Sequence, residues 1–145
     1  MKHPLILFLA LVVASPVALA HSGVENPAVM ARMTAMKSIA TATKTLGDMT
    51  KGTRAFDAAE AREAFEAIAA QSKRVPALFE AREDDPKSEA LPVIWDDFAD
   101  FEAKNATMQT TAAQLSRSVA TLDELRAGFN DLGATCAACH KTYRK

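Results

Sequence analysis

The sequence has few of the residues that would support several common classes of protein. Its 145 residues include two cysteines, five glycines, one tryptophan and one tyrosine, and the formal net charge is only −1. So small a net charge gives no electrostatic reason to expect nucleic-acid binding. Glycine and β-branched strand formers are scarce, whereas Ala, Leu, Lys, Glu and Met are plentiful. This composition predicts an all-α protein.

Long hydrophobic runs are also scarce, and the one apolar run lies at the start of the chain. Residues 5–13 are almost purely apolar, follow the basic start Met1-Lys2-His3, and precede the small-x-small sequence of residues 18–20. The pattern predicts a secretory signal peptide, residues 1–20, that is cleaved. The run is too short for a membrane span, so none is expected after cleavage. In a bacterial host the mature chain, residues 21–145, would be a single periplasmic domain.

Helical periodicity marks four segments of this domain. The first helix is predicted to run from Asn26-Pro27 to Gly52, and the second from Asp57 to about Pro76. The third is predicted to begin at about Pro92, and the fourth at the capping box of Thr121 and Glu124. Residues 76–91 are expected to form an irregular surface loop. The inward stripe of the first helix is expected to be Val29, Met33, Met36, Ala40, Thr43 and Gly47. Four amphipathic helices with mostly short links predict an antiparallel up-down-up-down four-helix bundle. An α-solenoid is the alternative, but no internal repeat supports it.

The C-terminal sequence Cys136-Ala137-Ala138-Cys139-His140 is the strongest chemical signal in the chain. C-x-x-C-H is the attachment signature of a c-type haem. The two thiols can add to the two vinyl groups of the porphyrin, and one helical turn brings both within reach. The imidazole of His140 can then bind the iron, because tethering makes this ligand effectively intramolecular. The sequence therefore predicts one covalent haem c, with its iron, near the C-terminus.

Three other uses of the cysteine pair are less consistent with the sequence. A thioredoxin-like redox motif belongs near a βαβ pattern, which this chain lacks. A closed zinc site needs four ligands, and outside the motif the mature chain offers only His21. A disulfide closing so short a loop would restrain little of the unfolded chain. A haem-free bundle with a disulfide would require both cysteines to carry no haem, which mass spectrometry would detect.

The ligand on the other iron face would decide the function. A thioether sulfur there would saturate the iron and favour its ferrous state, as in electron carriers, whereas an apolar side chain would leave the iron open to small gases. Candidates are Met33 and Met36 on the predicted inward stripe of the first helix, although methionine is also a common core residue. His21 is a weaker candidate because it would begin the mature chain, where residues are usually mobile.

At this point the sequence resembles a class II cytochrome c of the cytochrome c′ family. The resemblance covers essentially the whole mature chain and is carried by residues 32–37, 75–79, 92–95 and 136–144. In this family the distal position lies four residues after a basic residue of the first helix. Arg32 is that basic residue here, so the resemblance implies Met36 as the distal ligand and the low-spin, methionine-ligated branch. Members with an apolar residue at this place are five-coordinate.

Two arginines are further candidates for haem contacts. Arg32, one turn before Met36, could bind a propionate. Arg144, four residues after His140, is expected on the same helix face beside the proximal ligand, as the resemblance also implies. Either could instead be a solvated surface arginine.

The function that follows is electron transfer by a periplasmic mono-haem cytochrome with redox partner proteins and no enzymatic activity. The alternative is a five-coordinate cytochrome c′ that binds nitric oxide or carbon monoxide. The resemblance allows a homodimer through the first two helices. The acidic residues of the 76–91 segment could dock a basic redox partner, although such a run is usually only solvated.

Overall fold

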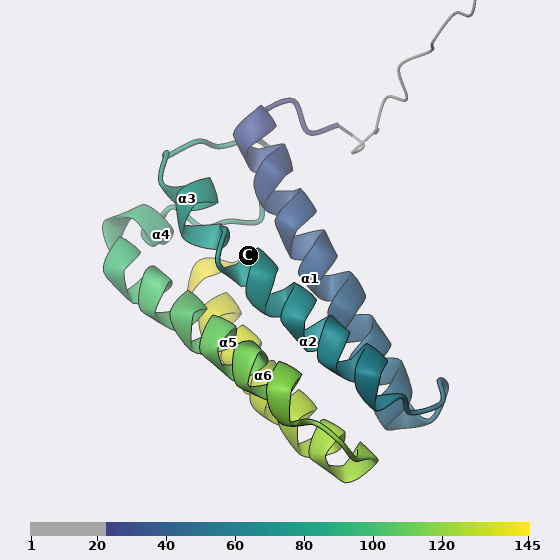
Figure 1. Cartoon of the computed structure of the whole chain (residues 1–145). Helices are drawn as coiled ribbons and strands as arrows, with labels where there is room; N and C mark the ends of the chain where they lie inside the picture. Colours follow the sequence, from purple (N-terminus) through teal and green to yellow (C-terminus); the bar gives the residue numbers. More distant parts are fainter. Residues whose placement is uncertain (1–22) are drawn as a thin grey trace, which may run out of the picture.

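The computed structural model describes residues 23–145, and the predicted signal peptide and His21 lie outside this range. Within it the chain forms six helices and no strand. Two helices are short, and four are long enough to build a bundle: α1 (Pro27–Lys51), α2 (Ala58–Ser72), α3 (Val75–Phe79), α4 (Val93–Asp96), α5 (Phe98–Ser118) and α6 (Leu122–Tyr143). The long helices α1, α2, α5 and α6 run up-down-up-down (Figure 1), which confirms the predicted four-helix bundle. No helix of residues 23–145 is both long and apolar enough to cross a membrane.

The helix ends lie where the sequence predicts them because local hydrogen bonds and backbone angles define them. The side chain of Asn26 accepts hydrogen bonds from the backbone N–H groups of Ala28 and Val29 at the start of α1. Gly52 ends α1 in the left-handed conformation, with φ 76°, which costs glycine no steric strain. Thr121 and Glu124 form the expected reciprocal capping box at the start of α6.

Two predicted boundaries differ from the structure. The segment 76–91 is not irregular throughout, because Pro76 lies in the first turn of α3, where its missing N–H costs no hydrogen bond. The predicted third helix is interrupted at Asp97, whose backbone (φ −137°, ψ 62°) separates α4 from α5. The side chain of Asp97 then caps α5 by accepting the N–H of Asp100 at 3.3 Å.

The core of the bundle is formed by apolar side chains from all four long helices. Its largest fully buried members are Leu46, Met49, Phe65, Ile68, Leu125 and Leu132. A smaller cluster lies at the end of the bundle that carries α3 and α4, and contains Val75, Phe79, Ile94, Phe101 and Tyr143. Half-buried Met36 packs against both clusters, so it lies where the core ends and the smaller cluster begins.

The predicted inward face of α1 is wrong by part of a turn. The buried residues of the helix are Val29, Arg32, Ala35, Ile39, Leu46, Gly47 and Met49, of which only Val29 and Gly47 belong to the predicted stripe. Of the predicted stripe, Met33 is 37% exposed and Ala40 is exposed. All six residues of that stripe nevertheless line one cavity. An apolar stripe predicts a desolvated face, but it does not distinguish packing against protein from packing against a cofactor.

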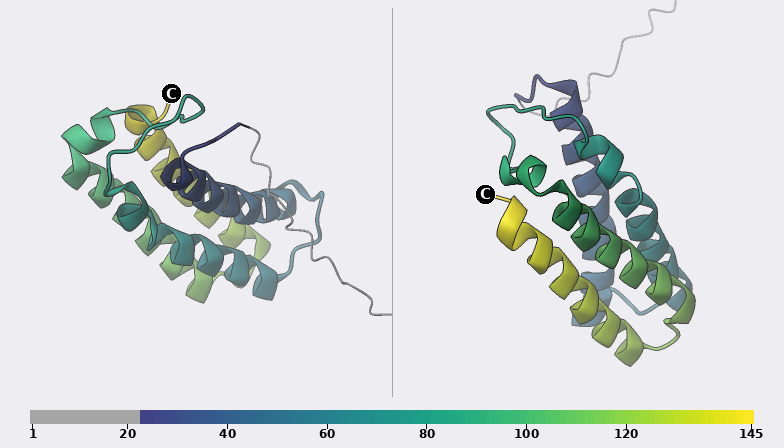
Figure 2. Two further views of the ribbon diagram at one scale, coloured as in Figure 1. Left: turned by 90° about the horizontal axis from the view of Figure 1, so that it is seen from above. Right: turned by 90° about the vertical axis from the view of Figure 1, so that its left-hand side faces the viewer.

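This cavity lies where α1 and α6 face each other. The contacts of α1 with α2, α2 with α5, and α5 with α6 are more extensive than those of α1 with α6. The right-hand view of Figure 2 shows the C-terminal part of α6 (yellow) apart from α1 (purple). Residues of both helices line the same hollow, so α1 forms one wall and α6 the opposite wall.

Candidate haem site

One turn of α6 carries the predicted attachment motif. Cys136 and Cys139 are half-buried and His140 is exposed, and all three line the cavity between α1 and α6. The spacings of three and four residues place these side chains on one side of the helix. The apolar stripe of Leu125, Leu132 and Cys139 along α6 therefore continues from the core directly into the attachment motif.

The protonation states of these groups follow from their surroundings. Burial raises the pKa of both thiols, and for Cys136 a hydrogen bond with Thr135 opposes this shift. Burial, followed by the positive charge of Arg144, lowers the pKa of His140, and the carboxylate of Glu89 opposes the shift. His140 is therefore neutral at neutral pH, which is the form of imidazole that binds metals. Cys136 and Cys139 form no disulfide with each other.

The opposite wall carries the predicted distal candidates. Met33 and Met36 of α1 both line the cavity. Met36 is half-buried and packs against both core clusters, whereas Met33 is 37% exposed. Packing therefore restrains the thioether of Met36 more than that of Met33. Whether either sulfur binds iron stays a prediction.

Apolar and aromatic side chains complete the cavity. Its volume is about 740 Å³, within the range of roughly 300–1,000 Å³ typical of ligand and cofactor sites. The Sδ atom of Met108 lies 3.8 Å from the Sγ atom of Cys136. Tyr143 packs edge-on against Phe101, with ring centroids 5.4 Å apart, and donates its hydroxyl to Asp100 at 2.6 Å. Phe129, Met108 and Phe101 were predicted only as helix-stripe residues, because periodicity alone does not show which part of a stripe meets a cofactor.

Asn105 supplies an unusual polar group to the same wall. It is 3% exposed, and its Nδ2 donates a hydrogen bond to the carbonyl of Ser72 at 3.0 Å. Its Oδ1 atom is buried and has no hydrogen-bond partner among residues 23–145. A buried acceptor of this kind on a cavity wall is a suitable site for an ordered water.

Arg32 lines the cavity but is mainly engaged elsewhere. Only 3% exposed, its guanidinium donates hydrogen bonds to the carbonyls of Leu78, Ala81 and Glu83 at 2.9, 2.6 and 2.7 Å, respectively. It also lies over the ring of Phe79, 4.9 Å from the centroid. These contacts were not predicted, and they give Arg32 a structural role at the base of the segment that follows α3. The predicted propionate contact stays a prediction.

The segment 80–91, called the strap below, connects the two walls of the site. Arg32 holds its beginning, and its far end pairs with the residues after the haem motif through the hydrogen bonds Leu91 N–H to Tyr143 C=O and Lys145 N–H to Glu89 C=O, both 2.9 Å. The strap residues Lys87, Ser88, Glu89 and Ala90 line the cavity. The strap is irregular and largely exposed, as expected, but it is also a hydrogen-bonded part of the site.

Arg144 is also placed by the strap. The sequence predicts Arg144 on the same helix face as His140. Helix α6 ends at Tyr143, however, and Arg144 follows it with an extended backbone (φ −124°, ψ 142°). Its Nε donates to the carboxylate of Glu89 at 2.7 Å. Arg144 still lines the cavity and lowers the pKa of His140. It is thus close enough to act on the imidazole electrostatically, and its role toward the cofactor stays a prediction.

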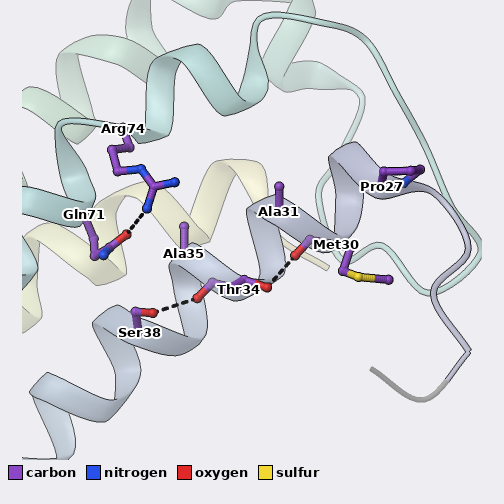
Figure 3. A pocket seen from close by; sticks show the side chains of 8 residues that line it. All are labelled: Pro27, Met30, Ala31, Thr34, Ala35, Ser38, Gln71 and Arg74. Atoms are coloured by element: carbon purple, nitrogen blue, oxygen red, sulfur yellow. Dashed lines mark hydrogen bonds between the residues drawn. The ribbon is translucent and has the colours of Figure 1, made fainter. Parts of the chain in front are cut away.

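A second, smaller hollow lies between α1 and α2, away from the thiols and the imidazole. It has a volume of about 440 Å³ and is lined largely by small and polar residues such as Ala31, Thr34, Ser38 and Gln71. Figure 3 shows that Ser38 donates its hydroxyl to the backbone carbonyl of Thr34 within α1, and that Arg74, just beyond the end of α2, donates to the side-chain oxygen of Gln71. The small residues leave space against another helix, but the predicted homodimer stays a prediction.

The larger cavity fits a covalent haem, and the zinc alternative finds no support. Two free thiols and an imidazole from one helical turn face an apolar space of suitable size, and a half-buried thioether lies on the opposite wall. Among residues 23–145, no group of three or more His, Cys, Asp or Glu side chains is placed to hold a metal ion directly. This fold and this site together define a c-type cytochrome built on a four-helix bundle.

Comparison with known proteins identifies the family. The family profile described as Cytochrome C′ matches residues 27–144, so the chain belongs to the cytochrome c′ family, whose cofactor is a covalent haem c with its iron. Relatives include cytochrome c-556 of Agrobacterium tumefaciens, 36% identical over 79% of this chain and 91% of that protein. Cytochrome c′ of Alcaligenes xylosoxydans is 34% identical over 81% of this chain and 93% of that one.

Solved structures agree with this assignment. Cytochrome c prime from Shewanella frigidimarina has a TM-score of 0.74 at 34% identity, covering 81% of this chain and 94% of that one. A nitric oxide complex of a variant of cytochrome c prime from Alcaligenes xylosoxidans has a TM-score of 0.71 at 32% identity, covering 81% and 94%, respectively. The family and the four-helix bundle expected from the sequence are thereby confirmed.

Proposed function

We propose that this protein is a periplasmic mono-haem electron carrier in which Met36 occupies the sixth position of the iron and can be displaced by nitric oxide or carbon monoxide. The haem would be attached through Cys136 and Cys139, with His140 as the other axial ligand. When bound, the haem iron supplies a centre that gains and loses one electron. The proposal includes no substrate turnover, so the protein would not be an enzyme.

The observation that carries the proposal is the convergence of these side chains on one cavity. Cys136, Cys139 and His140 reach it from α6, and Met36 reaches it from α1. A thioether opposite an imidazole gives a saturated coordination that changes little between oxidation states, and soft sulfur favours ferrous iron. Met36 is supported over Met33 because its side chain is packed against two clusters.

Gas binding is the part of the proposal to which the comparisons give more direct support. One matched structure is a nitric oxide complex of a cytochrome c prime variant, and another is a ferrous variant with bound NO. If the sulfur of Met36 only packs, the distal face is open and gas binding becomes the principal function. Electron transfer and gas binding therefore differ in whether the sulfur of Met36 would bind the iron.

Visible spectra of the purified holoprotein distinguish them. With Met36 bound, we expect a low-spin spectrum, a ferric sulfur-to-iron charge-transfer band, and slow binding of carbon monoxide by the ferrous protein. The variant Met36→Ala should lose the band and bind carbon monoxide rapidly. Met33→Ala is the matched control and should retain the band. A high-spin wild-type spectrum that shifts at once with carbon monoxide would exclude Met36 as a firm ligand and leave gas binding as the function.

A further inference from the structure

The charge around the cavity is opposite in sign to the charge of the whole chain. Eight charged side chains line it, six basic and two acidic, which is a net charge of +4 with His140 neutral. The whole chain carries a formal charge of −1. The two acidic residues are Asp48 and Glu89. Basic residues are therefore concentrated at this one site, while acidic residues predominate elsewhere.

Four exposed lysines form the outer part of this positive region, and they are called the lysine rim below. Lys37, Lys44 and Lys51 recur every seven residues along α1 and so extend for about 21 Å on one side of the helix. Lys87 adds a fourth positive charge from the strap. Lys44 is paired with Asp48, whereas Lys37, Lys51 and Lys87 have no ion pair within residues 23–145. Three lysines of the rim are thus available to an outside partner.

We infer that the lysine rim is the docking surface for a redox partner protein that carries acidic residues around its own redox centre. This inference rests on the proposed electron transfer and adds the location and the chemistry of the partner. A cleft of predominantly positive charge with apolar walls focuses its field and raises the local concentration of negatively charged partners. The expected partner chemistry is opposite to that suggested by the acidic residues of the 76–91 segment alone.

The net charge of the chain and the local charge at the cavity predict opposite effects of salt on the rate of electron transfer to charged reagents. Small oxidants of opposite charge therefore show which of the two charges controls the encounter. The reduced holoprotein is mixed in a stopped-flow instrument with hexacyanoferrate(III) or with tris(phenanthroline)cobalt(III). Each oxidant takes one electron from the protein and becomes hexacyanoferrate(II) or the cobalt(II) complex. If the rim controls encounter, the rate with the anion falls as salt is added, and the rate with the cation rises or stays constant. Control by the overall negative charge gives the reverse pattern and overturns the inference.

The variant Lys37→Gln/Lys51→Gln/Lys87→Gln tests the rim directly. Its rate with hexacyanoferrate(III) at low salt should fall roughly threefold or more, and its reduction potential should not change. Lys73→Gln is the control, because Lys73 is exposed at the end of α2 and does not line the cavity. A triple variant that behaves like this control overturns the inference. So does a changed reduction potential with equal effects on both oxidants, which would mean that these lysines bind the propionates.

Failure of the underlying electron transfer would look different. A five-coordinate gas binder would instead show a high-spin spectrum and an immediate response to carbon monoxide, whichever lysines it carries. Carbon monoxide provides an internal check, because an uncharged ligand does not respond to the field of the rim. Its binding to the ferrous protein should be the same in the wild type and in the triple variant.

Discussion

Replacing Arg32 with leucine should destabilise the protein by releasing the strap. The substitution removes three charge-assisted hydrogen bonds to the carbonyls of Leu78, Ala81 and Glu83. Bonds of this type contribute roughly 1.5–3 kcal/mol each. Ala81 and Glu83 are exposed, so water can replace two of the bonds, and leucine also avoids the cost of burying a charge. The expected net loss is about 3 kcal/mol, a large share of the ~5–15 kcal/mol that stabilises a typical domain.

Urea denaturation of the holoprotein, followed by far-ultraviolet circular dichroism, measures this loss. Hydrogen exchange provides the local readout, because the N–H groups of Ser88 and Leu91 are hydrogen-bonded in the intact strap and should exchange faster in the variant. Arg74→Leu is the matched control. Arg74 is exposed and makes one hydrogen bond, 3.1 Å long, to Gln71 in the adjacent turn, so its loss should cost less than about 0.5 kcal/mol.

Two outcomes would refute the structural role of Arg32. A free energy of unfolding within about 0.5 kcal/mol of the wild type would show that the three hydrogen bonds contribute little. Unchanged exchange in the strap together with a shifted reduction potential would instead indicate that the main partner of Arg32 is a haem propionate.

Two further predictions concern α6 and the acid stability of the strap. Gly128→Ala places a Cβ atom in steric overlap with Cδ2 of Leu115, so overpacking of about 1–3 kcal/mol should exceed the helix-propensity gain of ~1 kcal/mol. Gly133→Ala, with nothing within 4 Å, should stabilise the protein in the same urea titration, and stabilisation by both changes would contradict this reasoning. Hydrogen bonds from the backbone N–H groups of Lys87, Asn26 and Glu25 lower the pKa of Asp85. Since the folded state favours the carboxylate, its stabilisation is complete above the ordinary carboxyl pKa of about 3.9 and is lost as the pH falls through the lower folded value. The stability difference between wild type and Asp85→Asn should therefore be largest near pH 7 and shrink toward pH 3, and a pH-independent difference would show that Asp85 has no such role.

Most of the architecture could be predicted because its determinants are local. Asn26, Gly52 and Thr121 define helix ends through hydrogen bonds and backbone angles within a few residues. The attachment motif at Cys136 and His140 is equally local, since one helical turn contains all of its groups. The break at Asp97 was missed because the apolar periodicity continues across it from Ile94 to Phe98.

Features that depend on distant contacts could not be predicted. Arg32 was expected near the cofactor because of its position one turn before Met36, but its hydrogen bonds reach residues 46 to 51 positions away. No sequence pattern pointed to a role for Glu89, yet its carboxylate pairs with Arg144, which lies 55 residues away in the sequence. The position of the strap decides both sets of contacts. The apolar periodicity that predicts helices gives no information about the path of an irregular segment such as the strap.

By itself, the sequence determined the helices and their caps and predicted the covalent haem, with His140 as the expected iron ligand from α6, because each depends on neighbouring residues and on the chemistry of Cys136, Cys139 and His140. Only the tertiary structure decided which face of α1 meets the cavity and which lies in the core. It also decided that lysines from α1 and the strap surround one site on an overall acidic chain. The physical reason is that an apolar or charged pattern predicts whether a side chain is desolvated or solvated, whereas its neighbour is set by the packing of helices that lie far apart in the sequence.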